Sequence, residues 1–370
     1  MILTTHAGSL PRPAAVAELV VQQAQGMPVD VAAYEATVAT AIREIVRRQV
    51  DLGLDIVSDG ELGKPGFFQY VAGRYSGFGG GSTPVPRADL ADFPEYAKRL
   101  APVGGGVIRN PSCIGPVVLQ DRQAIERDIA NLKQAAREAQ PFGVFMTAAS
   151  PGIVAQNLRN AFYPSYEEYV WAVSDALREE YRLIVEHGLV LQVDCPDLAM
   201  GRHVTFADAS LDEFRRAVRL HVDVLNHALE GLPPDQLRLH LCWGNYPGPH
   251  HRDVPLRDIL HIVLSARPRF LSLEASNPRH EHEWAVFSEI DLPDEKVLIP
   301  GVIDSCSNYV EHPELVAQRI QRYASVVGPD RVIAGTDCGF GSSAVWAVVD
   351  PDIAWAKLGS LVEGAHLASR

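Results

Sequence analysis

Short apolar runs alternate with long amphipathic stretches along most of this 370-residue chain. The short runs are rich in β-branched residues and typical of buried strands, whereas the long stretches have helical periodicity. The eight runs that we interpret as strands are Ile2–Thr5, Asp55–Ser58, Val144–Thr147, Leu189–Val193, Leu237–Leu241, Phe270–Leu273, Val297–Val302 and Val332–Ala334. Because strands and helices alternate, we expect a parallel sheet.

The number of strands decides between two parallel folds. Eight units over this length fit a closed (β/α)8 barrel better than an open doubly wound sheet. No GxGxxG motif follows the first strand, which argues against a dinucleotide-binding half. We therefore predict an α/β fold, a (β/α)8 TIM barrel, in which residues 1–370 form a single catalytic domain. Residues 63–117 break the alternation and are predicted to be an irregular insertion after strand 2, with a hairpin in it.

Composition excludes several classes of protein. The chain has 33 Lys and Arg against 46 Asp and Glu, a net charge of −13, which disfavours binding to nucleic acid. No apolar run is long enough to cross a membrane. Five cysteines are too few for a disulfide scaffold, and the first residues lack the pattern of a signal peptide. These features predict a cytoplasmic enzyme.

Reactive side chains stand at the carboxyl ends of most predicted strands, where a barrel carries its active site. They are Ser9, Glu61, Asp194, His240, Cys242, Glu274, Asp304 and Cys338. A barrel held together by packing alone does not need ionisable groups at so many strand ends. We interpret this set as a catalytic site.

Four of these residues have the chemistry of a zinc site. His240 and Cys242 are two residues apart on a predicted strand, so their side chains lie on the same face and can reach one metal ion. Glu274 ends the next strand and Cys338 ends the last. Imidazole, thiolate and carboxylate groups are the ligands that zinc takes in tetrahedral sites. We therefore predict Zn²⁺ as the cofactor.

The segment Trp243–Asp253 follows two of the proposed ligands. It is rich in Gly, Pro and aromatic residues, which is typical of a loop with fixed turns. We predict that it is a lid over the barrel mouth, in which Trp243 and Tyr246 stack on a substrate or shield the site from water. His280, in a charged segment beyond Glu274, is expected to be exposed.

In their order and strand positions, these residues resemble the catalytic C-terminal barrel of the cobalamin-independent methionine synthase family. The resemblance extends to its single-barrel relatives, among them the zinc enzyme that adds coenzyme M to epoxides, and covers nearly the whole chain. It rests on the motifs Gly8-Ser9, Asp59-Gly60-Glu61, Val193-Asp194-Cys195-Pro196, His240-Leu241-Cys242, Leu273-Glu274-Ala275-Ser276 and Asp337-Cys338-Gly339. No second barrel accompanies this one in the sequence.

The resemblance implies roles for individual residues. The catalytic zinc would be bound by His240, Cys242, Glu274 and Cys338. The amino and carboxylate groups of homocysteine would be held by Ser9, Glu61 and Asp194. The family has a histidine after the seventh-strand aspartate, and this chain has Cys306 after Asp304. Asp304, Cys306 or a histidine of the lid would protonate the leaving group.

The function implied is zinc-dependent alkyl transfer to a thiol, most directly methylation of homocysteine from a methyl-folate or corrinoid donor. One alternative is the addition of another thiol, such as coenzyme M, to an epoxide. The other is a zinc-binding protein without turnover. Glu61 and Asp194 favour an amino-acid thiol, because a sulfonate thiol would need an arginine there. The expected partners are the thiol and the alkyl donor; a corrinoid protein and a second copy of the chain are left open.

Overall fold

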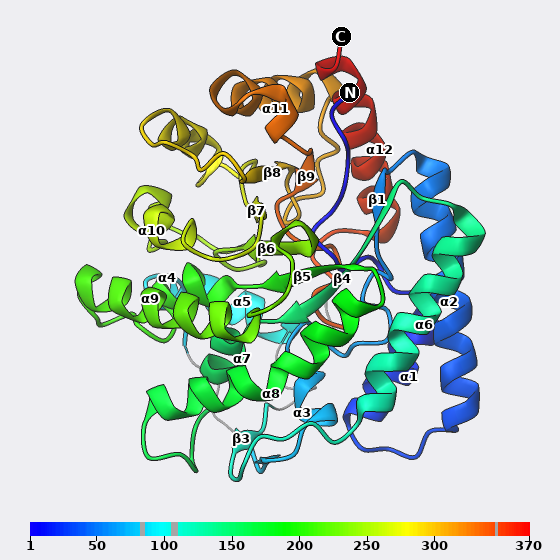
Figure 1. The fold of residues 1–370 in the computed structure, drawn as a ribbon, viewed down its shortest axis with the longest axis vertical. Helices are drawn as coiled ribbons and strands as arrows, with labels where there is room; N and C mark the ends of the chain where they lie inside the picture. Colours follow the sequence, from blue (N-terminus) through cyan, green and yellow to red (C-terminus); the bar gives the residue numbers. More distant parts are fainter. Residues whose placement is uncertain (82–85, 105–109, 345–346) are drawn as a thin grey trace.

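A parallel sheet of seven strands, in the order β1-β4-β5-β6-β7-β8-β9, forms the centre of the molecule (Figure 1). The computed structural model describes residues 1–81, 86–104, 110–344 and 347–370. The strands are β1 (Ile56–Val57), β4 (Gly143–Ala149), β5 (Val190–Asp194), β6 (Leu237–Leu241), β7 (Phe270–Leu273), β8 (Val297–Ile303) and β9 (Gly335–Thr336).

The N-terminal segment closes this sheet into a barrel. On one side, the Ile56 amide donates to the Thr4 carbonyl at 3.0 Å. On the other, the Thr5 amide donates to the Ala334 carbonyl at 2.9 Å, and the Ala334 amide donates to the Leu3 carbonyl at 2.8 Å. The segment is thus paired on both of its edges and takes the place of the eighth strand. The predicted (β/α)8 fold is confirmed, and its closure leaves the sheet without an open edge.

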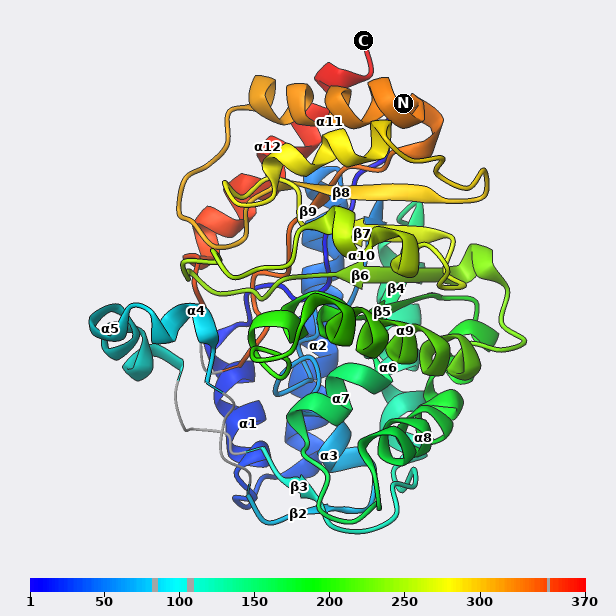
Figure 2. The ribbon, with the colours of Figure 1, turned by 90° about the vertical axis from the view of Figure 1, so that its left-hand side faces the viewer.

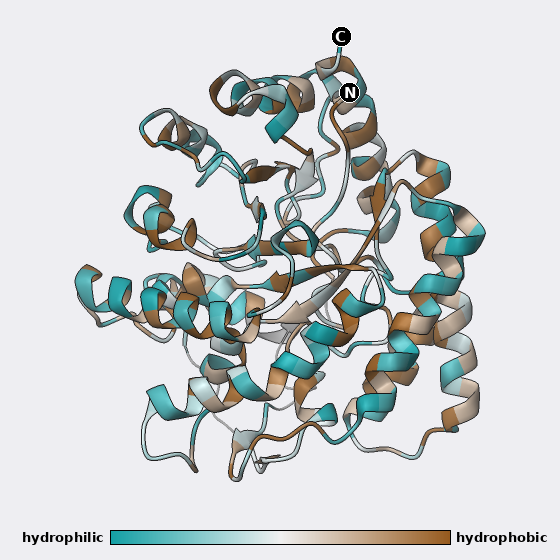
Figure 3. Ribbon diagram, in the orientation of Figure 1, coloured by the Kyte–Doolittle hydropathy of each residue, from teal (hydrophilic) through white to brown (hydrophobic). Residues whose placement is uncertain are grey.

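Helices surround the barrel, and the face that each turns toward the sheet is the more apolar one (Figures 1 and 3). They are α1 (Ala14–Ala24), α2 (Val31–Leu52), α6 (Arg122–Ala139), α7 (Pro151–Asn157), α8 (Tyr166–Glu186), α9 (Leu211–Ala228), α10 (Leu256–Val263), α11 (Pro313–Val327) and α12 (Pro351–Ala368), with the 3-10 segment η4 (Glu281–Ser288) between β7 and β8. Sequence patterns alone did not predict α1, α7 or η4. In the part of the chain described, no helix combines the length and apolarity that a membrane span requires.

The insertion after the second barrel strand is more regular than predicted. It contains α3 (Val71–Arg74), β2 (Phe78–Gly79), α4 (Ala88–Ala91), α5 (Pro94–Gly104) and β3 (Ser112–Cys113), and β2 pairs antiparallel to β3. Residues 82–85 and 105–109 of the predicted insertion lie outside the described residues. Figure 2 shows α4 and α5 standing out from the body of the barrel. Their position makes them a wall for the cavity described next.

Candidate metal centre

His240, Cys242 and Cys338 gather at the carboxyl end of the barrel. Their candidate ligand atoms all lie within 4.8 Å of one another, and all three residues are buried. The two sulfur atoms, Sγ of Cys242 and Sγ of Cys338, are 3.0 Å apart. The Oε1 atom of Glu274 is 3.6 Å from the Cys338 sulfur. The structure therefore brings three of the predicted ligands into one cluster and places the fourth, Glu274, beside it.

Neighbouring strands orient these side chains. His240 pairs with Ser272 across β6 and β7, and its Nδ1 lies 3.0 Å from the Ser272 hydroxyl, which leaves Nε2 as the ligand atom. The Glu274 carboxylate accepts hydrogen bonds from the Trp243 amide and from Nδ2 of Asn277, both at 2.7 Å. These hydrogen bonds fix the rotamers of the candidate metal ligands His240 and Glu274 before any ion binds.

The electrostatics of the cluster favour a cation. Burial lowers the pKa of His240 to about 3, so its imidazole is neutral and able to bind metal. The hydrogen bond from Cys338 lowers the pKa of the Cys242 thiol, but burial and Glu274 outweigh it and raise that pKa to about 11. Burial also raises the pKa of Cys338 well above its ordinary value. Both thiols are protonated without a cation, and a divalent ion would hold them as thiolates. One nitrogen, two sulfurs and a nearby carboxylate fit Zn²⁺.

Asp337 is a positioning residue that the sequence reasoning missed. Its Oδ1 accepts hydrogen bonds from the amides of Ala275 (2.7 Å) and Ser276 (2.9 Å), and its Oδ2 accepts one from the Asn277 amide (2.9 Å). The carboxylate thus folds the chain directly after Glu274 onto the end of β9. Its place beside Cys338 in the sequence was the available signal.

A cavity of about 600 Å³ opens beside the cluster, within the size range of small-molecule sites. Its inner wall is made by side chains at strand ends, namely Ser9, Glu61, Asp194, His240, Cys242 and Cys338. Its outer wall comes from the insertion and from the loop after β6, and includes Phe67, Phe68, Arg87, Leu90 and Tyr246. The predicted substrate residues of the strand ends therefore share one cavity with the cluster.

Two carboxyl groups in this cavity, those of Glu61 and Asp194, have raised pKa values although Lys64 acts on both in the opposite direction. Glu61 Oε2 is buried and makes no hydrogen bond within the described residues. Asp194 accepts a hydrogen bond from Nε2 of Gln192 at 2.7 Å. Burial raises the pKa of Glu61, and burial together with the Glu61 charge raises that of Asp194 well above its usual range. A cationic group between them would relieve this strain.

Ser9 is held against the segment that follows Cys338. Its carbonyl accepts a hydrogen bond from the Phe340 amide at 2.8 Å, and its hydroxyl accepts one from the Gly341 amide at 3.3 Å. A Cβ atom at Gly339 would lie 2.0 Å from the Ser9 hydroxyl oxygen. Only glycine permits this approach, which explains the Asp337-Cys338-Gly339 motif.

The two aromatic residues of the predicted lid have different positions. Tyr246 lines the cavity, and its hydroxyl donates to Asp89 of α4. Trp243 is fully buried outside the cavity, donates from Nε1 to the Val254 carbonyl at 2.7 Å and stacks on His280 at a centroid distance of 4.0 Å. A stacking role of Trp243 toward substrate finds no support.

The expectation that His280 is exposed is wrong. Its ring is buried, with Nε2 at 3.0 Å from the Asp253 carboxylate and Nδ1 at 2.8 Å from the Glu283 carboxylate. These two acidic partners raise the pKa of His280 to about 10, although burial, the largest influence, acts in the opposite direction. Asp253, 27 residues earlier, and Glu283, three residues later, together stabilise the protonated ring.

Asp304 and Cys306 lie in a neighbouring cavity of about 200 Å³. Asp304 accepts a hydrogen bond from the Cys306 amide at 2.8 Å, and Sγ of Cys306 donates to Oδ1 of Asn245 at 3.2 Å. Asn245 lines both cavities, so it lies between this pair and the larger one. The structure does not bring Asp304 or Cys306 to the wall that Glu61 and Asp194 form.

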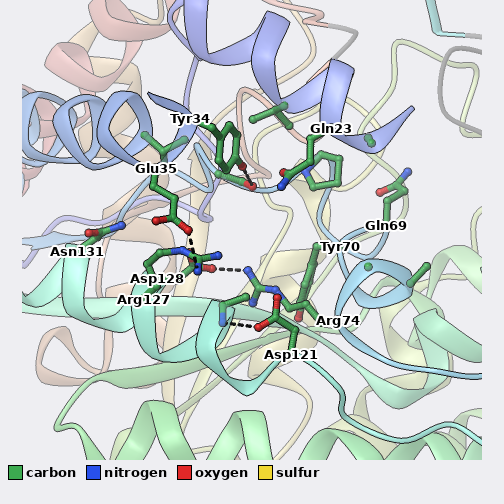
Figure 4. Close-up of a pocket in the computed structure, with 18 of the residues that line it drawn as sticks. Gln23, Tyr34, Glu35, Gln69, Tyr70, Arg74, Asp121, Arg127, Asp128 and Asn131 are labelled. Atoms are coloured by element: carbon green, nitrogen blue, oxygen red, sulfur yellow. Dashed lines mark hydrogen bonds and ion pairs between the residues drawn. The ribbon is translucent and has the colours of Figure 1, made fainter. Parts of the chain in front are cut away.

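A further cavity of about 480 Å³ lies among α1, α2, α6 and the insertion (Figure 4). Its charged side chains neutralise one another: Arg127 pairs with Glu35 at 3.1 Å, and Arg74 pairs with Asp128. We call it the helix-side cavity and the larger one the strand-end cavity. The helix-side cavity has neither a thiol nor an unpaired carboxylate in its wall.

Comparison with known proteins agrees with this geometry. The family model described as "Cobalamin-independent synthase, Catalytic domain" matches residues 2–83. The methionine synthase of Thermococcus kodakarensis is 23% identical over 341 residues, which are 91% of this chain and 84% of that protein. The 2-hydroxypropyl-CoM lyase of Xanthobacter autotrophicus is 25% identical over 356 residues, 88% of this chain and 84% of that protein.

A solved structure gives the same picture of the fold. The B12-independent methionine synthase of Shewanella sp. W3-18-1, in complex with selenomethionine, superposes with a TM-score of 0.77 at 20% identity. The superposition covers 100% of this chain and 98% of that one. The resemblance of this chain to the cobalamin-independent methionine synthase family, which its strand-end motifs predict, is confirmed by sequence and by fold.

Proposed function

We propose that this protein is a zinc-dependent enzyme that transfers an alkyl group to a thiol, and that the thiol is homocysteine, which is methylated to methionine. One observation carries the proposal. The unpaired Glu61 carboxylate oxygen and the adjacent Asp194 face the same cavity as the His240, Cys242 and Cys338 cluster. The relatives named methionine synthase add support from outside the structure.

The metal ion would be held by His240, Cys242 and Cys338, with Glu274 as the fourth ligand. When bound, zinc would hold the acceptor sulfur as a thiolate at neutral pH, where a free thiol is mostly protonated. Two cysteine thiolates and one carboxylate would make the site electron-rich, which suits a nucleophilic sulfur.

The chain itself would bind the amino-acid part of the acceptor. Glu61 and Asp194 would neutralise its ammonium group, and the Ser9 hydroxyl would donate to its carboxylate. With both ends of the amino acid fixed, the sulfur is aimed at the electrophilic carbon, which lowers the entropic cost of the reaction. The buried walls of the strand-end cavity would exclude water, which competes for the electrophile.

The chemical step replaces one bond by another. The sulfur–carbon bond forms as the bond between the methyl carbon and its donor atom breaks, and a leaving folate nitrogen takes up one proton. We propose Asp304 and Cys306 as the source of that proton, delivered from the neighbouring cavity past Asn245. A corrinoid donor would need no such proton. Addition of a thiol to an epoxide, as the name of the Xanthobacter relative suggests, is the second candidate.

The decisive experiment follows the loss of free thiol by zinc-loaded protein. Homocysteine and coenzyme M are each offered with methyl-tetrahydrofolate, methylcobalamin or a small epoxide. Methionine formation from homocysteine is the expected result. If coenzyme M reacts and homocysteine does not, coenzyme M is the acceptor in place of homocysteine. If the protein binds zinc but consumes neither thiol, it is a zinc-binding protein without catalytic activity.

A further inference from the structure

A lysine is buried directly behind the strand-end cavity. Lys64 follows Glu61 by three residues and is 3% exposed, and its side chain is not among those that line the cavity. Within the described residues it forms no ion pair, whereas buried Lys357 pairs with Glu311 at 2.9 Å. We propose that Lys64 is a positioning residue of the acceptor site, which acts through the Thr147 hydroxyl to orient Glu61 toward the ammonium group of the thiol. This inference rests on the proposed function.

Several contacts give Lys64 a fixed place. Its Nζ atom donates hydrogen bonds to the Thr147 carbonyl at 2.6 Å and to the Thr147 hydroxyl at 3.2 Å. The same atom lies 4.6 Å from the centroid of the Tyr70 ring. Arg12 holds the backbone, because its Nη2 donates to the carbonyls of Glu61 at 2.8 Å and of Lys64 at 2.9 Å. The ammonium group of Lys64 cannot leave Thr147 without breaking these contacts.

Lys64 determines where the proton of the Thr147 hydroxyl points. An ammonium group only donates, so the hydroxyl oxygen accepts from Lys64 and its own proton is free for another acceptor. That acceptor is Glu61, which receives a side-chain hydrogen bond from Thr147. Oε2 of Glu61 is buried and has no hydrogen bond within the described residues. One oxygen of this carboxylate is therefore held by Thr147, and the other is left for a ligand.

Gly8 allows the Glu61 and Thr147 side chains to meet. A Cβ atom at this position would lie 2.6 Å from Glu61 Oε1 and 2.7 Å from the Cγ2 atom of Thr147. Gly8 also has a φ of 125°, a conformation that other residues rarely adopt. The contact from Thr147 to Glu61 therefore depends on the glycine of the Gly8-Ser9 motif.

The second carboxylate has an orienting residue of its own. Nε2 of Gln192 donates to Oδ1 of Asp194 at 2.7 Å and to the Ala7 carbonyl at 2.8 Å. Gln192 of β5 is the register partner of Thr147 of β4. Both stand two residues before the ends of their strands, so the two orienting side chains are neighbours beneath the two carboxylates. Lys64 is the partner that Thr147 needs for this task, because a hydroxyl can rotate and an amide group cannot exchange its ends freely.

The charge of Lys64 also suits an occupied site. Glu61 and Asp194 bring two negative charges, and Lys64 together with a bound ammonium group brings two positive ones. A buried set of charges that sums to zero costs less than one with an uncompensated charge. A ligand without the ammonium group leaves a buried carboxylate oxygen without a partner, which is unfavourable.

The test measures binding to the metal-free protein, so it depends neither on zinc nor on turnover. The probes are methionine, the product of the proposed reaction, and 4-(methylthio)butanoate, which lacks only the amino group. In calorimetric titration the wild type should bind methionine at least about tenfold more tightly, the size expected for a charged hydrogen bond. Lys64→Met and Thr147→Val should each lower this preference about fivefold by weakening the binding of methionine.

A double variant separates one chain of contacts from two independent effects. If Lys64 acts through Thr147, the variant with both Lys64→Met and Thr147→Val should lower the preference no further than either change alone. Thr147→Ser keeps the hydroxyl and should keep the preference of the wild type. A role in packing alone would not produce this pattern, because serine leaves the larger gap.

Lys296 supplies a matched control. It is a second buried lysine, 5% exposed, and its Nζ donates to the carbonyls of Ala266 at 2.5 Å and Pro268 at 2.7 Å. It directly precedes β8 and so lies at the opposite end of the barrel from the strand-end cavity. Lys296→Met should lower the melting temperature but keep the full preference for methionine. Circular dichroism of each variant checks that the fold is intact.

Three outcomes overturn the inference. They are an unchanged preference in Lys64→Met, a double variant whose loss is the product of the two single losses, and an equal loss of preference in Lys296→Met. Failure of the proposed function has a different signature, because the wild type itself then binds the two probes equally or binds neither.

Discussion

The strand-end cavity and the helix-side cavity are similar in size, about 600 and 480 Å³, but they differ in how their charges are balanced. In the wall of the helix-side cavity, Arg74 pairs with Asp128 and, outside that wall, with the buried Glu180. In the strand-end cavity, Glu61 and Asp194 repel each other, and two thiols touch without a cation. Volume alone does not identify a site, whereas buried groups that lack a partner do.

The difference also has an energetic side. A buried carboxyl group whose pKa is raised destabilises the folded state when it is ionised, and a bound cationic group offsets that cost. The fold tolerates this cost at the strand ends, where Glu61 even adopts a left-handed backbone with φ of 57°. The following changes test the contrast between the two cavities, from the largest expected effect to the smallest.

The largest effect is expected at the cysteines. Cys242→Ser and Cys338→Ser should each abolish stoichiometric zinc binding and lower alkyl transfer by at least about a hundredfold, because a hydroxyl is a poor ligand beside a thiolate. Metal analysis and a thiol-loss assay measure this. Cys113→Ser, at a buried thiol of β3, is the control and should keep its zinc. Full zinc content in both cluster variants would refute the assigned ligands.

The second effect concerns the acceptor. Glu61→Gln and Asp194→Asn should each weaken homocysteine binding by about 1.5–3 kcal/mol, the worth of a charged hydrogen bond. The melting temperature of the metal-free protein should not fall, because burial and the neighbouring carboxyl group make the ionised form of each residue unfavourable despite the nearby Lys64. Calorimetric titration and thermal unfolding separate the two effects. Unchanged homocysteine binding would show that the two carboxylates do not bind the acceptor.

The helix-side cavity should respond in the opposite way. Asp128→Asn leaves Arg74 with a weaker partner, so the free energy of unfolding should fall by about 1–3 kcal/mol. Its KM for homocysteine should equal that of the wild type. A raised KM with intact stability would mean that this cavity takes part in catalysis, and the contrast between the two cavities would be lost.

The carboxyl pair also predicts a dependence on pH. Folding raises the pKa of Glu61 above its unfolded value of about 4.3, so the folded state binds the proton more tightly. The unfavourable contribution therefore starts near pH 4 and grows as the pH rises toward the folded pKa. The melting temperature of metal-free Glu61→Gln should exceed that of the wild type by an amount that increases over this range. A constant difference from pH 4 to pH 8 would contradict the raised pKa.

The smallest effect is expected at the rim. Asp92, at the end of α4, pairs with His251 and Arg252 of the loop after β6, and all three side chains are largely exposed to solvent. Asp92→Asn should change neither the melting temperature nor alkyl transfer measurably, because exposed ion pairs contribute little. Asp89→Asn, at the buried partner of Tyr246, is the comparison and should lower the melting temperature. Equal effects of both changes would mean that the rim pairs hold the loop.

Much of the barrel follows from local sequence pattern. The bounds of β6 and β7 agree with those predicted, because short apolar runs between turn signals leave few alternatives. The grouping of the predicted metal ligands could also be predicted from the sequence, because the strands of a parallel barrel all end at one rim. The helix α1 was missed because Glu18 is the one charged residue among its eleven. With so few charges, the sequence does not show the polar face that is typical of a surface helix.

Contacts between distant segments could not be predicted. Tyr246 and Asp89 are 157 positions apart, and nothing near either residue indicates the other. The buried ring of His280 likewise has a distant hydrogen-bond partner, the Asp253 carboxylate, 27 positions earlier in the chain. The position of Asp304 and Cys306 in a separate cavity depends on residues of the loop after β6 that line both cavities, such as Asn245, whose place the sequence pattern does not specify.

The pairing of the N-terminal segment has a consequence for how the chain folds during synthesis. The Ala7 amide donates to the Thr336 hydroxyl, 329 residues along the chain, and the same segment completes the barrel beside β9. A ribosome has made about nine-tenths of the protein before this partner emerges, so the edge of the N-terminal segment that faces β9 stays open for most of translation. Near the other terminus, the Ser369 hydroxyl accepts a hydrogen bond from the Ile2 amide at 2.9 Å. A circular permutant that joins these neighbouring ends and starts within the insertion should therefore pair the N-terminal segment with β9 early and leave the pairing of β1 with β4 as the last step.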